Sequence, residues 1–183
     1  IKKDLDYLAT VEDGEVIVTS RTLDDKQWTV AFMLDDGPVK FYRYDRGEGK
    51  AHFLFNSRDD LEGYPLVKMH PVLIPTRDGK ELVSYLTLPP GSDPDGDGVP
   101  NKPVPMVLNV HGGPWARDAW GFDPDHQWLA NRGYAVLAVN YRGSTGFGKS
   151  FVNAANGEWA GKMHDDLIDA VNWAVEKGIA QKD

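Results

Sequence analysis

The segment His111-Gly112-Gly113-Pro114 has residue types suited to acyl-transfer chemistry. It follows the apolar run 106–110, which is typical of a buried strand. Two glycines at the end of such a strand let the backbone approach a ligand, because no Cβ stands in the way. A backbone N–H there can stabilise the negative oxygen that forms when a carbonyl is attacked, and one such donor lowers the barrier by about 3–4 kcal/mol. The tetrapeptide alone fits a tight turn without a catalytic role equally well.

Residues 143–150, Gly-Ser-Thr-Gly-Phe-Gly-Lys-Ser, fit the pattern of a phosphate-binding loop. In such a loop the backbone N–H groups and Lys149 bind phosphates, Ser150 binds magnesium, and a helix follows directly. Asn156-Gly157 interrupts the expected helix within two turns. The segment is not a nucleophile elbow either, because no glycine stands two residues before Ser144. A P-loop-type nucleotide-binding domain stays open as an alternative function.

Carboxylates at alternate positions indicate a second candidate site, a calcium loop. Its expected ligands are Asp93, Asp95, Asp97 and Asn101, which occupy the first, third, fifth and ninth loop positions. The twelfth position holds Val104 instead of a bidentate glutamate, so a solvated acidic turn is the competing interpretation. The sequence predicts no organic cofactor and, at most, a structural calcium ion. A non-catalytic, β-rich interaction module with this weak calcium loop is a further alternative function.

Composition restricts the classes of protein to consider. The 183 residues include 20 Lys and Arg against 28 Asp and Glu, and the net charge of −8 predicts no binding to nucleic acid. The absence of cysteine excludes disulfides, thiolate zinc sites and a cysteine nucleophile. No apolar run approaches the roughly 18 residues that span a membrane, so no membrane contact is expected. The sequence starts at Ile1 without a signal peptide, which suggests a processed protein or an excised segment. The compartment is left open between cytoplasmic and periplasmic or secreted.

The elements that must position these residues begin with an antiparallel sheet. Short runs rich in β-branched and aromatic residues, separated by turns that contain glycine, predict one propeller blade or part of a sandwich. The predicted strands cover residues 15–19, 28–33, 39–44 and 52–55. We expect a blade-like segment at 1–57, a connector at 58–70 and a second domain at 71–183.

The second domain has the alternating pattern of an α/β fold. Its predicted elements are a hairpin of strands 72–75 and 82–88, buried parallel strands 106–110 and 134–139, a helix between them at about 124–131, and a longer helix at 165–177. Asp165, Asp166 and Asp169 are expected at the start and on the solvated face of the longer helix.

Six stretches carry a further signal through their common order and spacing. They are Leu-Glu-Gly-Tyr-Pro-Leu (61–66), Thr-Arg-Asp-Gly (76–79), Tyr-Leu-Thr-Leu-Pro (85–89), His-Gly-Gly-Pro-Trp (111–115), Asn-Tyr-Arg-Gly-Ser-Thr-Gly-Phe-Gly (140–148) and the helix with Asp165-Asp166. Together they resemble the prolyl oligopeptidase family of serine peptidases, and most of all its acylaminoacyl-peptidase and dipeptidyl-aminopeptidase-like branch. This resemblance is more specific than any single motif.

The resemblance implies a β-propeller followed by an α/β-hydrolase domain. Residues 1 to about 57 would be the last blade, and residues 71–183 the N-terminal half of the hydrolase. Gly113 would donate its N–H to the oxyanion, and the likeness of residues 143–150 to a nucleotide loop would be accidental.

The same resemblance implies what this chain lacks. The family's serine, in a G-x-S-x-G elbow, and its acid and base are expected beyond residue 183, so the chain alone is expected to be inactive. The implied substrate of the complete protein is a peptide. An exposed edge of the half sheet is expected to cause self-association.

Overall fold

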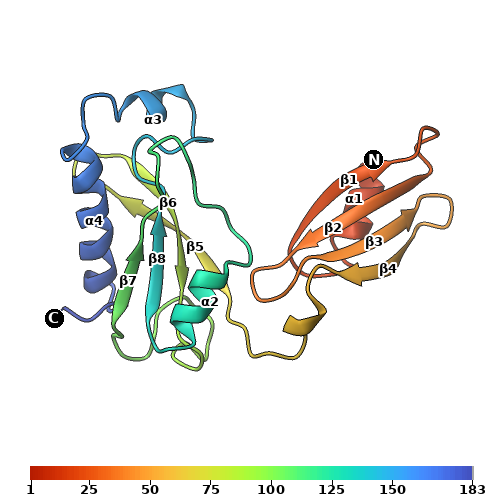
Figure 1. The fold of residues 1–183 in the computed structure, drawn as a ribbon, viewed down its shortest axis with the longest axis horizontal. Coiled ribbons are helices and arrows are strands. Elements are labelled where there is room, and N and C mark those ends of the chain that lie inside the picture. The colour runs from red at the N-terminus through yellow and green to blue at the C-terminus, as the bar shows by residue number, and fades with distance from the viewer. Residues whose placement is uncertain (183) are drawn as a thin grey trace. The chain divides into compact units, whose positions relative to one another are not determined.

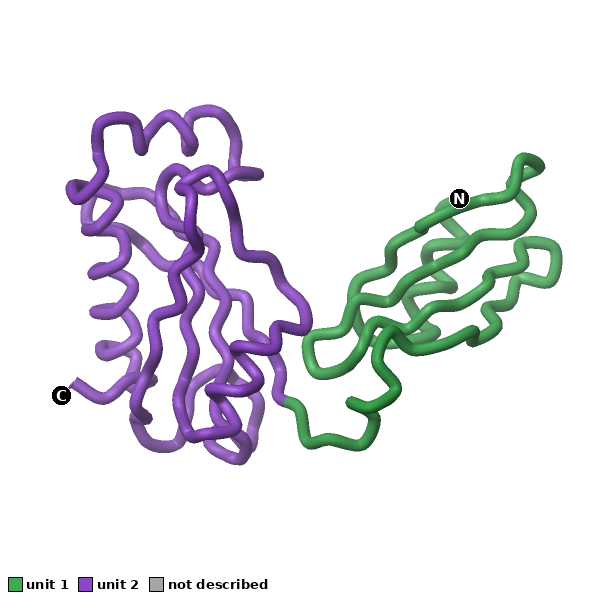
Figure 2. The backbone as a smooth tube through the Cα atoms, viewed as in Figure 1, with its two compact units in different colours: residues 1–66 green, residues 67–183 purple. Residues whose placement is uncertain are grey.

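The chain divides into two compact units, Ile1–Leu66 and Val67–Asp183, and the computed structural model describes residues 1–182 (Figure 2). The division falls within the segment 58–70, for which the sequence predicts a connector. Boundaries at residues 57 and 71 stay predictions. No helix within residues 1–182 is long and apolar enough to cross a lipid bilayer.

The first unit is an antiparallel sheet in the order β1-β2-β3-β4, with a short helix packed on it (Figure 1). Its elements are α1 (Lys2–Leu8), β1 (Glu15–Arg21), β2 (Gln27–Met33), β3 (Lys40–Asp45), β4 (Lys50–Asn56) and the 3-10 turn η1 (Asp59–Leu61). Alternate residues of β2, Trp28, Val30 and Phe32, are buried in one cluster with Leu8 of α1. The four predicted strands are confirmed. The sequence predicts no helix before residue 15, because so short a segment establishes no apolar period.

The second unit is built on a mixed sheet in the order β5-β6-β8-β7. Its elements are β5 (Met69–Pro75), β6 (Glu81–Thr87), β7 (Met106–Asn109), α2 (Pro124–Ala130), β8 (Ala135–Val139), α3 (Lys149–Asn153) and α4 (Lys162–Glu176). Strand β8 pairs antiparallel with β6 and parallel with β7. The predicted hairpin and the strand–helix–strand unit are both confirmed.

Helices cover both faces of this sheet, with α4 on one face and α2 on the other (Figure 1). Side chains of β6 alternate between the faces, as the strand period requires. Leu82 and Leu86 belong to the cluster that contains Ala170 and Ala174 of α4. On the opposite face, Thr87 Oγ1 lies 2.9 Å from Nδ1 of His126 in α2. Burial lowers the pKa of His126, so the imidazole of this inner residue stays neutral.

Helix α4 differs from the prediction in the burial of one acidic residue. Met163, Asp166, Ala170 and Ala174 face the core, whereas Ile168 is exposed. The expectation that Asp166 lies on the solvated face is therefore wrong. A carboxylate can occupy this buried position because a guanidinium satisfies it, and a hydrophobic pattern does not reveal such a pair.

Candidate functional site

The predicted oxyanion donor lies where two parallel strands end. Strands β7 and β8 finish at Asn109 and Val139, and the loops that follow, residues 110–118 and 140–148, leave from the same edge of the sheet (Figure 1). In α/β sheets this edge is where ligands bind. The topology therefore brings together two motifs that stand about thirty residues apart in the sequence.

Gly113 has a backbone conformation that a residue with a side chain rarely adopts. Its φ is +133°, and a Cβ would lie 2.6 Å from the backbone nitrogen of Trp115. The following Gly113–Pro114 peptide bond is cis. Gly112 and Gly113 are both exposed, and the Gly113 N–H donates no hydrogen bond within residues 1–182. This N–H is thus available to a ligand, and its oxyanion role stays a prediction.

His111 is held by the loop that follows β8. The Tyr141 hydroxyl donates a hydrogen bond to the His111 carbonyl oxygen at 2.9 Å, and its ring stacks on the imidazole with centroids 4.6 Å apart. The Oγ of Ser144 lies 2.8 Å from Nε2 of His111. The sequence assigned neither Tyr141 nor Ser144 a role, although both lie in a stretch that carries the family resemblance.

The Ser144–His111 pair resembles a nucleophile beside its base, but its geometry does not support that role. Ser144 is fully buried, and its hydroxyl donates to the Tyr141 carbonyl oxygen at 2.7 Å. The hydroxyl proton is therefore used within the fold, and no substrate carbon can approach Oγ. A serine nucleophile needs both an accessible oxygen and a base that accepts its proton.

Asn140 fixes the far end of the loop that carries Gly113. Its side-chain oxygen accepts from the Asp118 N–H at 2.9 Å, and its amide donates to the Asp118 and Val83 carbonyl oxygens at 3.2 and 3.0 Å. Oδ2 of Asp118 is buried without a partner within residues 1–182. Burial raises the pKa of Asp118, and the nearby His111 acts in the opposite direction.

Arg142 joins three of the resembling stretches in one buried ion-pair network. Its guanidinium binds Asp78 in the β5–β6 turn at 2.8 and 2.9 Å, and Asp166 of α4 at 2.8 and 2.6 Å. The Arg142 side chain is 2 % exposed and that of Asp166 0 %. Hydrogen bonds from Arg142 hold the pKa of Asp78 well below its usual range. This network is structural, because it leaves no polar atom of Arg142 directed at a ligand.

The loop of residues 143–150 does not form a phosphate cradle. The N–H groups of Gly143, Ser144 and Thr145 donate to the carbonyl oxygens of Phe151, Tyr141 and Ala116. Helix α3, which follows, has only five residues. A phosphate-binding loop needs free N–H groups and a helix N-terminus, so the structure does not support the nucleotide-binding alternative.

An apolar cavity of about 260 Å³ lies beside Pro114 and Trp115, which follow the glycine pair. It is lined by Pro114, Trp115, Ala155, Asn156, Gly157, Trp159 and Met163. Trp115 and Trp159 are both largely exposed at its rim. The cavity lies between the residues that follow Gly113 and the start of α4, where an apolar group could be taken up.

The carboxylates of the predicted calcium loop converge. One oxygen from each of Asp93, Asp95 and Asp97 lies within 4.8 Å of the others. Burial opposes ionisation of Asp93, but hydrogen bonds from backbone N–H groups outweigh it and lower its pKa, whereas the hydrogen bond with Asp93 raises the pKa of Asp95. The Asn101 N–H donates to the Ser92 carbonyl oxygen at 2.8 Å and closes the loop. Calcium binding by these residues stays a prediction.

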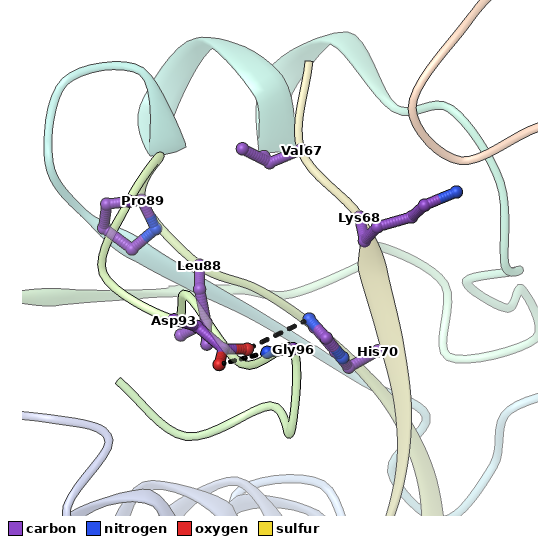
Figure 3. A pocket seen from close by; sticks show the side chains of 8 residues that line it. Val67, Lys68, His70, Leu88, Pro89, Asp93 and Gly96 are labelled. Carbon is purple, nitrogen blue, oxygen red and sulfur yellow. Dashed lines mark hydrogen bonds and ion pairs between the residues drawn. The ribbon is translucent and has the colours of Figure 1, made fainter. Parts of the chain in front are cut away.

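A small cavity of about 180 Å³ lies beside this loop (Figure 3). Nε2 of His70, on β5, is 3.7 Å from Oδ2 of Asp93, and the Gly96 N–H donates to the same carboxylate at 3.0 Å. The His70 contact joins the loop to the sheet, and the Gly96 hydrogen bond lies within the loop. Neither of these two contacts with Asp93 involves Gly113.

Comparison with known proteins supports one family. Residues 120–183 match the model of the prolyl oligopeptidase family. The chain is 60 % identical over 183 residues to dipeptidyl aminopeptidase BIII of Pseudoxanthomonas mexicana, covering 100 % of this chain and 27 % of that protein. It is 43 % identical to dipeptidyl peptidase family member 6 of Caenorhabditis elegans, covering 98 % of this chain and 26 % of that protein.

Solved structures agree with the sequence relatives. A puromycin-hydrolyzing peptidase of Mycobacterium tuberculosis superposes with a TM-score of 0.69 at 25 % identity, covering 85 % of this chain and 24 % of that one. An acylaminoacyl peptidase of Pyrococcus horikoshii has the same fold at 18 % identity, with a TM-score of 0.69 and coverage of 93 % and 26 %. The chain thus spans about a quarter of the length of these proteins. Within that span, this chain belongs to the prolyl oligopeptidase family.

Proposed function

We propose that this chain is part of a serine peptidase that cleaves peptide bonds by acyl transfer to a serine. The unit of residues 67–183 would be the N-terminal half of its α/β-hydrolase domain, and residues 1–66 would include the last blade of a β-propeller. The order of the mixed sheet and the antiparallel four-stranded sheet support this division. Identity of 60 % along the whole chain to a dipeptidyl aminopeptidase supports release of dipeptides as the activity.

The N–H of Gly113, which has no partner within residues 1–182, is the observation that carries the proposal. When a serine attacks a peptide carbonyl, the carbonyl oxygen becomes negative, and a fixed N–H donor stabilises it. Gly113 offers such a donor at the edge of the sheet, and the two residues that follow it line an apolar cavity. The nucleophile, the acid and the base would lie beyond residue 183, so the chain alone is proposed to be inactive.

Labelling with a fluorophosphonate, which reacts with activated serines, tests this function together with hydrolysis of a dipeptidyl anilide. We expect the complete protein to be labelled once and to hydrolyse the anilide. The 183-residue chain, as the matched control, should show neither reaction. Labelling of the isolated chain would place the nucleophile inside it and contradict the proposal, as would an inert complete protein.

The open edge of the sheet supports a proposal about association. Strand β7 has no neighbour on its outer side within residues 1–182, except where Val104 forms a single parallel bridge with Ala180. An unpaired edge is a template for another strand. We therefore expect the isolated chain to self-associate, and a monomeric mass in light scattering would contradict this.

A further inference from the structure

His111 precedes the two glycines, and the loop after β8 contacts it at both its main chain and its ring. The Tyr141 hydroxyl binds its carbonyl oxygen, the Tyr141 ring stacks on its imidazole, and Ser144 Oγ meets its Nε2. We propose that Tyr141 and Ser144 are positioning residues that fix His111 and, through it, the direction of the Gly113 N–H. The inference rests on the proposed function.

We call the contacts of Tyr141 and Ser144 with His111 the clamp, and the directions of their hydrogen bonds are consistent with it. Because the Ser144 hydroxyl donates to the Tyr141 carbonyl oxygen, its Oγ accepts from His111 in the tautomer that carries the proton on Nε2. In that tautomer Nδ1, which lies 3.0 Å from the Gly112 carbonyl oxygen, donates no hydrogen bond to it. Burial raises the pKa of Tyr141, which keeps its hydroxyl protonated and able to donate. Both side chains are buried, Ser144 completely and Tyr141 to all but 6 %. The burial of Tyr141 and Ser144 keeps water from competing for their own hydroxyl hydrogen bonds.

The same loop also holds the far side of the glycine pair. The Thr145 N–H donates to the Ala116 carbonyl oxygen at 2.9 Å, and Asn140 binds both main-chain groups of Asp118. Gly113 thus lies between two attached points, although its own N–H has no partner within the described chain. Contacts on both sides therefore hold the Gly113 main chain in place, and its N–H is left without a partner within residues 1–182.

The Gly113 N–H must be held in place by other residues, because the two glycines have no side chains that could fix the loop. Glycines lose more conformational freedom than any other residue when they are fixed. A donor contributes to catalysis only if it already points at the position of the developing charge, and a displacement of about 1 Å can cost about a hundredfold in rate. The loop of residues 140–145 supplies the rigidity that the glycine pair lacks.

Two variants of the complete protein test the clamp. Tyr141→Phe removes the hydroxyl and keeps the ring, and Ser144→Ala removes the acceptor of Nε2–H. Tyr44→Phe is the matched control, since it removes a buried tyrosine hydroxyl that donates to Asp4 at 3.0 Å in the other unit. All rates are expressed per serine titrated with fluorophosphonate, so that misfolded molecules do not count.

The readouts separate positioning from general structural support. We expect Tyr141→Phe and Ser144→Ala to lower kcat about tenfold with KM unchanged, which indicates an interaction made in the transition state. Inhibition by a peptide aldehyde, which forms a tetrahedral adduct with the serine, should weaken by the same factor. Binding of the dipeptide product should not change. Tyr44→Phe should alter none of these values.

Each other outcome decides against one of the two proposals. An inactive wild type contradicts the proposed function itself. An active wild type whose two variants keep their kcat and aldehyde affinity overturns the clamp. Equal weakening of aldehyde and product, or loss of folding in both variants, shows a structural role only and overturns it as well.

Discussion

Two glycine-rich loops leave the same edge of the mixed sheet, and they use their backbone donors in opposite ways. In the loop of residues 140–148, three consecutive N–H groups, from Gly143 to Thr145, are bonded to carbonyl oxygens of the fold. In the loop of residues 110–118, the Gly113 N–H has no partner within residues 1–182. Glycine content alone does not distinguish a ligand-binding loop from a structural one. What distinguishes them is whether each backbone N–H has a hydrogen-bond partner within the fold. The comparison predicts that loss of the ion pairs that anchor the first loop lowers stability, whereas a change at Gly113 in the second loop lowers activity.

The largest expected effect comes from the anchor of the structural loop. Asp166→Ala leaves the buried guanidinium of Arg142 without its closest partner, and such a loss costs about 3–5 kcal/mol of unfolding free energy. Urea denaturation of this chain measures it. Asp165→Ala is the control, because its contact with Arg77 is exposed and contributes less than about 1 kcal/mol. Equal effects of the two variants would contradict the structural role of the loop.

The second loop should show the opposite pattern. Gly113→Ala places a Cβ against the backbone of Trp115 and forces a change in φ, so the loop must move. We expect kcat of the complete protein to fall about a hundredfold, as for loss of one oxyanion donor. Gly112→Ala is the matched control, since its Cβ meets nothing within 4 Å, and it should stay near wild type. A loss of thermal stability that explained the whole decrease in rate would contradict the comparison.

The pH dependence of stability tests the anchor by a separate route. Arg142 lowers the pKa of Asp78 below the value of 3.8 expected in the unfolded chain. This stabilisation is complete above that value and disappears as the pH falls toward the folded pKa. The difference in urea midpoint between wild type and Asp78→Asn should therefore be constant near neutral pH and shrink below about pH 4. The exposed control Asp60→Asn should show no such trend, and a constant difference at all pH values would contradict the ion pair.

The acidic loop extends the comparison from backbone N–H groups to side-chain carboxylates, which are candidate metal ligands. If Asp93, Asp95 and Asp97 bind calcium, the ion at ten times its Kd adds about 1.4 kcal/mol to stability. Differential scanning calorimetry with calcium and then with a chelator measures the shift in Tm. Asp97→Asn keeps an oxygen that can accept from the Val99 N–H but removes a charge, so the shift should decrease. An unchanged Tm would favour a solvated acidic turn.

The smallest effect is expected for nucleotides. Because Gly143, Ser144 and Thr145 donate their N–H groups within the fold and helix α3 has only five residues, titration calorimetry with magnesium and ATP should show no binding. Lys149→Ala should change nothing. Saturable binding that this substitution abolishes would reverse the assignment of the two loops.

The sequence predicts most of the fold because its apolar periods are clear. The buried run at β8 and the turn at Asp78-Gly79 indicate their elements directly. The burial of Asp166 in α4 is not predictable in the same way, because Asp166 is counted as polar and only its ion pair with Arg142 makes its burial possible. Arg142 lies 24 residues before Asp166, so the pattern of apolar residues within the helix does not reveal this pair.

The candidate site is predictable only in part for a similar reason. Gly113 follows from the residue types and from the resemblance, but its unbonded N–H does not. Tyr141, Ser144 and Asn140 act on the glycine loop through contacts that cross between two strand ends. The signal that could have pointed to them was the recurrence of polar residues directly after a buried strand, at the edge where ligands bind.

The guanidinium of Arg142 also bears on how the molecule matures. Arg142 pairs with Asp78, which precedes it in the chain, and with Asp166, which follows it. During synthesis the arginine therefore meets its second carboxylate only after α4 has been made. A nascent chain that has not yet reached the helix must keep this cation hydrated at the surface. Burial of the Arg142 side chain therefore accompanies docking of α4, which supplies the fully buried carboxylate of Asp166.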